Sequence, residues 1–189
     1  MKLASFCIGT GRSWGVVAER GVYDCSRLAP SLDDFVQRGK DALKSLEEEL
    51  ADGGLPLYEP DAVRLDAPLR RPGKLIAIGL NYRDHCRETN SPEPTRPIVF
   101  AKFRTAIIGT GDEIRWSRSL TDQVDWEVEL GVVIGKTARN VTQAEALDYV
   151  YGYTVVNDVS ARELQSGDGQ WVRAKSLDTF CPMGPVVVT

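Results

Sequence analysis

The sequence predicts a strand-rich chain with short helices, arranged as a small N-terminal unit followed by a larger one. Short apolar runs bounded by glycine-rich turns recur along the chain, which is typical of β-strands. Leucines at helical spacing are confined to short segments. Residues 67–73 (APLRRPG) have the composition of a linker. We therefore divide the chain into residues 1–70 and 71–189.

The N-terminal unit is expected to begin with strands and continue with helices. Residues 2–8, 14–18 and 22–25 are predicted strands, separated by glycines. Ser31 suits the N-cap of a first helix. Residues 41–51 carry leucines at helical spacing, and two glycines at 53 and 54 end this second helix.

The second unit contains more strands than helices. Three prolines within residues 91–97 mark an irregular loop, and Thr142 and Glu145 form a capping box. Residues 173–182 are expected to be rich in turns. The predicted strands cover 74–78, 98–101, 124–134 and 151–156, and the predicted helices cover 83–88, 142–149 and a short stretch after Asp158.

Composition narrows the classes of function. The chain of 189 residues is 42% hydrophobic and 26% charged, with a net charge of -4 and no basic cluster, which argues against nucleic acid or an anionic membrane as a partner. No stretch approaches the roughly 20 apolar residues of a spanning helix, and the N-terminus lacks a signal peptide's apolar core. Four scattered cysteines are expected to be reduced thiols. These features predict a cytoplasmic protein that acts on a small metabolite.

Glu127 and Glu129 stand two residues apart in the predicted strand 124–134, so their side chains should share one face. A half-exposed strand with its acidic face in water would explain the pair equally well. However, the apolar continuation 131–135 suggests burial on both faces, where unpaired glutamates would be costly. The pair therefore indicates a cation site.

Asp158 follows the strand 151–156 and is the candidate third ligand. Three carboxylates make an all-oxygen set that suits Mg²⁺ or Mn²⁺. Alternatively, Asp158 is only a turn or N-cap residue ahead of Ser160.

Other polar residues could take part in catalysis. His85 is the single histidine, and Glu88 lies three residues later on the same predicted helix, so the two could form a base and its orienting carboxylate or merely a surface contact. Lys175 could hold a substrate carboxylate or an oxyanion, or be a solvated lysine. Arg162 and Gln165 could bind an anionic substrate or face water.

Six segments, in order, resemble the fumarylacetoacetate hydrolase family. The match covers residues 72 to 189, whereas residues 1–70 resemble the variable N-terminal domain of bacterial-type members. The resemblance implies an α+β, β-rich roll or barrel of mixed strands that pairs into a homodimer. The segments are IGLNYRDH (78–85), VFAK (99–102), VDWEVEL (124–130), GYT (152–154), NDVSAR (157–162) and KSLDTF (175–180).

The resemblance also implies roles for particular residues. The metal ligands would be Glu127, Glu129 and Asp158. The metal would usually be Mg²⁺, with Mn²⁺ or Ca²⁺ as alternatives. The catalytic residues would be His85, Glu88 and Lys175, and the substrate-binding residues Arg162, Gln165 and Lys102. Thr179 would support the metal shell, and residues 82–97 would form a lid.

The implied reaction is metal-dependent cleavage of a carbon–carbon bond in a small diketo acid, through a stabilised enolate. Decarboxylation or isomerisation of a 2-oxo acid would use the same enolate, and a non-catalytic metal-binding relative is the rival from another class. Many family members have Asp at the position of Glu163, and family members usually continue well beyond the position of Thr189. We therefore expect a fragment or a C-terminally truncated chain with an open site.

Overall fold

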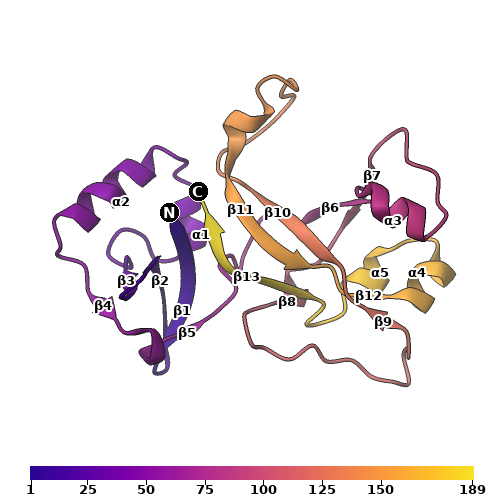
Figure 1. Ribbon diagram of the computed structural model, residues 1–189, viewed down its shortest axis with the longest axis horizontal. Coiled ribbons are helices and arrows are strands. Elements are labelled where there is room, and N and C mark those ends of the chain that lie inside the picture. The colour runs from indigo at the N-terminus through magenta and orange to yellow at the C-terminus, as the bar shows by residue number, and fades with distance from the viewer.

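The computed structural model describes residues 1–189 and is dominated by a nine-stranded mixed sheet, which fits the predicted α+β class. The strand order is β10-β11-β13-β1-β2-β3-β4, with β5 paired to β1 and β8 paired to β13. Because β10 and β4 are the two ends of this path, the sheet is open and not a closed barrel. Figure 1 shows the N-terminal strands on the left, and β10 and β11 near the middle.

The elements run along the chain in the following order. The strands are β1 (Lys2–Ile8), β2 (Gly11–Ala18), β3 (Gly21–Asp24), β4 (Leu57–Tyr58), β5 (Arg64–Leu65), β6 (Ile76–Gly79), β7 (Ile98–Ala101), β8 (Ile107–Ile108), β9 (Val124–Asp125), β10 (Val128–Ile134), β11 (Val150–Asn157), β12 (Ser160–Ala161) and β13 (Cys181–Val188). The α-helices are α1 (Leu32–Val36), α2 (Ala42–Ala51), α3 (Arg83–Glu88), α4 (Arg162–Asp168) and α5 (Val172–Lys175), and the 3-10 helices are η1 (Pro60–Ala62), η2 (Arg104–Ala106) and η3 (Ala146–Tyr149).

The N-terminal unit confirms most of the element predictions. Ser31 caps α1, its side chain accepting a hydrogen bond of 3.1 Å from the amide of Asp34. Trp14 stacks on Phe35 with ring centroids 4.5 Å apart, and its indole nitrogen donates to the carbonyl of Ala29 at 2.7 Å. This buried, hydrogen-bonded tryptophan fixes α1 on the sheet.

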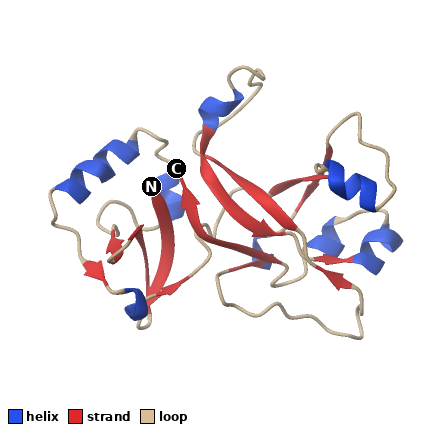
Figure 2. Cartoon of the chain, viewed as in Figure 1, coloured by secondary structure: helices blue, strands red, loops and turns tan.

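The two predicted units share one sheet. β1 pairs antiparallel with β13, Leu3 opposite Val187, so the first and last strands of the chain are neighbours. The two termini accordingly lie side by side in Figure 1. In Figure 2, helices flank the strands at both ends of the molecule. The boundary after residue 70 remains a prediction.

Two element predictions in the second unit were confirmed only in part. The capping box at Thr142 forms only in part, because the Glu145 carboxylate accepts from the hydroxyl and amide of Thr142 but the helix that follows is the four-residue η3. The predicted turn-rich stretch overlaps α5, which ends at Lys175, and bends and turns follow at residues 177–179. No helix is long and apolar enough to cross a bilayer.

The strand predicted over 124–134 divides into β9 and β10, with a break at Trp126 and Glu127. β10 is not buried on both faces, which corrects our expectation. Its apolar side chains point outward, with Val128 76% and Leu130 62% exposed. The more shielded face is the one that carries Glu129, Gly131 and Val133. The hydrophobic run therefore covers the outside of the sheet, and the carboxylates face inward.

Candidate active site

A single antiparallel register brings Glu127 and Asp158 together. β10 pairs with β11 through Val128 and Asn157, and β9 pairs with β12 through Asp125 and Ser160. The same register continues across the break, which places Glu127 opposite Asp158. The Asp158 amide donates to the Glu127 carbonyl at 2.8 Å, as expected for this register. Side chains directly opposite each other share one face, so two carboxylates meet here.

Asn157 secures the break in the strand. Its side-chain oxygen accepts a hydrogen bond of 3.1 Å from the amide of Glu127, and the Asp125 side chain accepts one of 2.9 Å from the amide of Trp126. The break leaves the amides of Trp126 and Glu127 without backbone partners in the strand ladder, and these two side chains accept hydrogen bonds from them instead. Glu127 is held at a fixed position between two short ladders.

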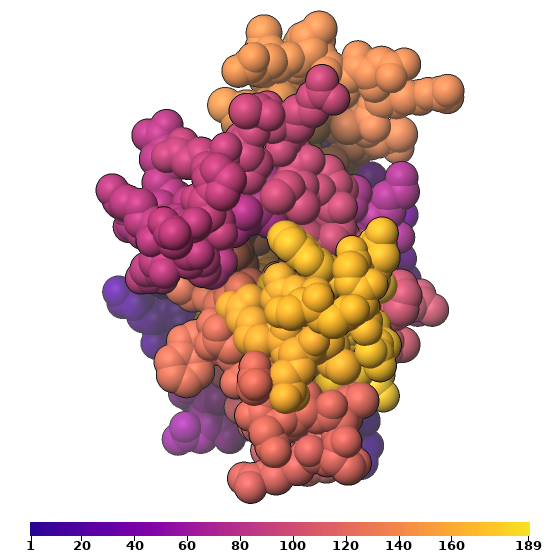
Figure 3. All heavy atoms as spheres, turned by 90° about the vertical axis from the view of Figure 1, so that its right-hand side faces the viewer, coloured from indigo at the N-terminus to yellow at the C-terminus, as the bar shows by residue number.

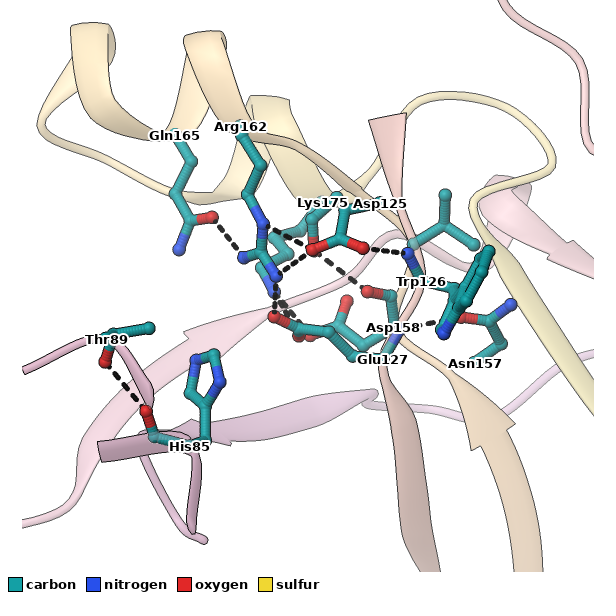
Figure 4. Close-up of polar contacts among 12 residues, drawn as sticks. His85, Thr89, Asp125, Trp126, Glu127, Asn157, Asp158, Arg162, Gln165 and Lys175 are labelled. Atoms are coloured by element: carbon teal, nitrogen blue, oxygen red, sulfur yellow. Dashed lines mark hydrogen bonds and ion pairs between the residues drawn. The ribbon is translucent and has the colours of Figure 1, made fainter. Parts of the chain in front are cut away.

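Lys175 lies between the two opposed carboxylates (Figure 4). Its ammonium nitrogen is 2.6 Å from Glu127 Oε2 and 3.0 Å from Asp158 Oδ2, and its side chain is only 3% exposed. The reading of Lys175 as a solvated lysine is thus excluded. Burial alone would raise the pKa of Glu127, but the charges and hydrogen bonds of Lys175 and Arg162 outweigh it and lower the pKa.

Arg162 forms a second cationic contact with Glu127. One guanidinium nitrogen, Nη2, lies 2.6 Å from Glu127 Oε1 and 2.7 Å from Asp125 Oδ2, while Nη1 donates to Gln165 Oε1 at 2.9 Å. Arg162 and Gln165 both lie on α4, so the structure brings this predicted substrate-binding pair together (Figure 4). Sequence reasoning missed Asp125, although the two-residue spacing of Asp125, Glu127 and Glu129 was a signal for it.

Lys102 is buried and contacts the carboxylate oxygen of Asp158 that Lys175 does not use. Its ammonium donates to Asp158 Oδ1 at 2.6 Å and to the backbone carbonyls of Val159 and Lys175, and its side chain is 2% exposed. Burial lowers the pKa of Lys102, and the charge of Asp158 opposes this effect. These contacts make Lys102 a support for Asp158, and its predicted contact with substrate stays a prediction.

Glu129 has no ion-pair partner. Burial, followed by the negative charges of Glu127 and Asp158, raises the pKa of Glu129, and a hydrogen bond with Tyr82 acts in the opposite direction. The Tyr82 hydroxyl also accepts from the amide of Leu130 at 3.2 Å, which ties the segment before α3 to β10. The three predicted metal ligands thus influence one another electrostatically.

The three carboxylates do not converge on one point, and no group of His, Cys, Asp and Glu side chains is arranged to hold a metal ion. The physical reason is that the Lys175 ammonium occupies the space between Glu127 and Asp158. The donor set is nevertheless suited to a hard divalent cation, because it consists of oxygens only. The cluster also contains four carboxylates, counting Asp125, but only three cationic side chains.

His85 lies on α3 and extends toward the side of the cluster where Glu127 and Arg162 lie (Figure 4). Its imidazole forms no hydrogen bond or ion pair, and only its backbone carbonyl is used, by Thr89. Glu88, the last residue of α3, is exposed and is not bonded to His85. The structure therefore brings His85 to the side of the site without the predicted partner. Figure 3 shows segment 80–97 in magenta beside α4 and α5 in yellow-orange.

The side chain of Thr179 bonds to the backbone of Arg115 and to none of the carboxylates. Its hydroxyl accepts from the Arg115 amide at 2.8 Å and donates to the Arg115 carbonyl at 3.1 Å. Its φ of 71° is unusual for a β-branched residue. Thr179 anchors the long connection before β9, and the predicted support of a metal shell stays a prediction.

Comparison with known proteins agrees with this fold. Residues 74–189, more than half of the chain, match the family model described as fumarylacetoacetate (FAA) hydrolase, C-terminal. Over its full length the chain superposes on the fumarylacetoacetate hydrolase of psychrophilic Exiguobacterium antarcticum with a TM-score of 0.83 and 36% identity, covering 66% of that structure. It also superposes on the 5-carboxymethyl-2-hydroxymuconate delta-isomerase of Mycobacterium smegmatis with a TM-score of 0.76 and 33% identity, covering 67% of that structure.

Curated relatives extend the likeness to other activities. The mitochondrial oxaloacetate tautomerase FAHD2A of Bos taurus is 43% identical over 175 residues, which are 89% of this chain and 55% of that protein. The chain thus spans about half the length of the curated relatives that it matches. Fold, site and comparisons together define a member of an enzyme family. The chain belongs to the fumarylacetoacetate hydrolase family.

Proposed function

We propose that the protein is a divalent-metal-dependent enzyme that interconverts the keto and enol forms of a small 2-oxo acid of the oxaloacetate type. The observation that carries this proposal is the opposition of Glu127 and Asp158, with Glu129 two residues away on the same face. The names of the relatives, a tautomerase and an isomerase, support enol chemistry. Our first sequence-based reading, hydrolysis, thus becomes the second candidate.

Glu127, Glu129 and Asp158 would hold the cation, with Mg²⁺ as the first choice and Mn²⁺ or Ca²⁺ as alternatives. When bound, it would supply Lewis-acid polarisation of the 2-oxo and carboxylate oxygens of the substrate. The half-buried Glu129, which has no ion-pair partner, is the group on this face that most requires a counter-charge.

The chain's own residues would bind and orient the substrate. Arg162 is held by Asp125 and Gln165, so its guanidinium is pre-oriented for a carboxylate of an anionic substrate. Lys175 would neutralise negative charge that develops on the oxygen of the 2-oxo group. These contacts would select a short, doubly acidic molecule.

His85 is the candidate base that would take a proton from the carbon beside the 2-oxo group. Its imidazole has no protein partner, so it is available to a ligand. Glu88 remains a proposed orienting carboxylate, and that role would require its side chain to turn toward His85.

Hydrolysis of a carbon–carbon bond in a diketo acid is the second candidate. The free imidazole of His85 favours it, because the same group could activate a water, and the 36% identical fumarylacetoacetate hydrolase shares the fold. Decarboxylation would use the same enolate without the attacking water.

Two assays on one preparation would separate the candidates. Enol-to-keto conversion of oxaloacetate would be followed by the ultraviolet absorbance of the enol, and acylpyruvate cleavage by product analysis, each with Mg²⁺ or EDTA. We expect EDTA-sensitive enol conversion that exceeds cleavage. Cleavage alone would favour hydrolysis, and the absence of both activities despite Mg²⁺ binding would favour a non-catalytic relative.

We also propose a cytoplasmic homodimer. The outward face of β10 and β11 carries paired apolar side chains, Leu130 opposite Val155 and Val132 opposite Tyr153, all exposed. A contiguous exposed apolar patch of this kind marks an interaction surface. The cytoplasmic location rests on the sequence, whereas several relatives are named as mitochondrial.

A further inference from the structure

Each of the two opposed carboxylates uses its two oxygens for two different cations. Glu127 binds Arg162 through Oε1 and Lys175 through Oε2. Asp158 binds Lys102 through Oδ1 and Lys175 through Oδ2. Lys175 is therefore the one cation that the two carboxylates share, and it occupies the oxygens that point toward each other.

The three cations differ in what else holds them. Arg162 also donates to Asp125 and Gln165, and Lys102 also donates to two backbone carbonyls. The ammonium of Lys175 has no other acceptor, and its remaining neighbour is the ring of Phe100, 5.4 Å from the nitrogen to the centroid. Removing Lys175 from the carboxylates would break no other hydrogen bond, whereas removing Arg162 or Lys102 would break several.

An ammonium and a divalent cation would repel each other at these oxygens. Lys175 lies 2.6 Å from Glu127 Oε2 and 3.0 Å from Asp158 Oδ2. Mg²⁺ binds its oxygen ligands at about 2.0–2.1 Å, so an ion on either of these oxygens would lie close to the ammonium, and like charges repel strongly in a poorly solvated site.

We propose that Lys175 is an exchangeable internal counter-ion: its ammonium holds the opposed carboxylates together without metal and is displaced when a divalent cation binds. This inference rests on the proposed metal-dependent function. Lys102 and Arg162 stay in place, each on the outer oxygen of its carboxylate. The displaced ammonium keeps its contact with the face of Phe100, which is itself packed edge-on against Trp171 at 5.4 Å. Metal loading thus frees a positive charge for the substrate.

The first test measures how accessible Lys175 is, with no substrate or turnover. The protein would be treated briefly with an amine-acylating reagent, in EDTA or in saturating Mg²⁺, and the labelling of each lysine would be quantified by mass spectrometry. Lys175 should be protected in EDTA and should react on the order of tenfold faster with Mg²⁺, within the range of coupling between linked sites. Lys102 is the matched control, because it is equally buried and should stay protected in both conditions.

The second test uses Lys175→Met and measures Mg²⁺ affinity by calorimetry. Because binding and displacement are linked, removal of the competing ammonium should strengthen Mg²⁺ binding, also on the order of tenfold. The labelling of the unchanged protein does not depend on how well this variant folds. Calorimetric Mg²⁺ binding with Lys175 still protected would overturn the inference and leave the proposed function standing. Absence of Mg²⁺ binding would overturn both.

Discussion

Glu127 and Asp158 lie directly opposite each other across an antiparallel ladder, with the ammonium of Lys175 between their carboxylates. Two like charges at directly opposed positions destabilise a sheet unless a cation compensates them. The fold therefore places two acidic side chains together and supplies the cations that permit this.

Loss of either opposed carboxylate should abolish metal binding. In Glu127→Gln or Asp158→Asn, Mg²⁺ affinity measured by calorimetry should fall by more than about 100-fold, beyond the loss usual for groups outside the ligand set. Glu113→Gln, which changes an exposed carboxylate paired only with Arg115, should leave the affinity unchanged. Unaltered binding in both site variants would place the metal elsewhere.

Lys102 should matter for stability as well as for the site. Lys102→Met leaves Asp158 with one buried cationic partner fewer and removes the hydrogen bonds to two carbonyls. We expect the free energy of unfolding, measured in urea, to fall by about 3–5 kcal/mol, as for other broken buried pairs. The matched variant Lys44→Met, at an exposed position, should change it by less than about 0.5 kcal/mol.

His85→Ala should separate catalysis from metal binding. Because the imidazole makes no hydrogen bond or ion pair, its removal should leave Mg²⁺ affinity and stability unchanged. We expect kcat to fall by about 10²–10⁴-fold if His85 is the base. The kcat of Glu88→Gln would show whether Glu88 orients His85 during turnover. If Glu88 is exposed and uninvolved, this change should have little effect on kcat. Full activity in His85→Ala would assign the base to another group.

The apolar face of β10 should control association. Leu130→Arg introduces a charge into this face and should shift the protein from dimer to monomer in analytical ultracentrifugation. Leu147→Arg changes an equally exposed leucine on η3, outside the face, and should leave the dimer intact. A monomeric wild-type protein at micromolar concentration would contradict the proposed homodimer.

The four free cysteines should differ in reactivity. Burial raises the pKa of Cys25 to about 12 and that of Cys181 to about 11, so neither forms a reactive thiolate near neutral pH. Cys86 is buried as well, whereas Cys7 is partly exposed. A thiol-specific chromogenic reagent should therefore modify one cysteine rapidly in the native protein and all four after denaturation. Cys7→Ser should remove the rapid phase, and rapid modification of several native thiols would argue against this burial.

The raised thiol pKa values also set the sign of a pH effect. A thiol whose pKa is higher in the folded than in the unfolded state contributes stability that is present below the unfolded value and is lost as pH rises through the folded value. For Cys25 and Cys181 this window begins near the ordinary thiol pKa of about 8.5. The free energy of unfolding of Cys25→Ser and of the wild type would be measured in urea at neutral and at alkaline pH. Raising the pH should lower this free energy less in the variant than in the wild type.

Local patterns determined much of the fold. The capping hydroxyl of Ser31, the glycine turns of the first strands and the helical residues 83–88 depend on interactions within a few positions, and the structure contains them. The division of the strand at Glu127 could not be foreseen, because it depends on the side chain of Asn157, thirty positions later. The same limit applies to η3, where a local cap did not extend into an α-helix.

The sequence by itself determined that Glu127 and Glu129 share a face and, through the ordered motifs, that Asp158 and Lys175 belong to the same site. Only the tertiary structure decided which face is buried, since the period of a strand is the same whichever side meets the core. It likewise decided that Lys102 contacts Asp158, that Asp125 joins the cluster, and that Lys175 separates the opposed carboxylates. Such contacts join residues far apart in the chain, and charge pairing between them is set by the register of the sheet, which spacing along the sequence does not encode.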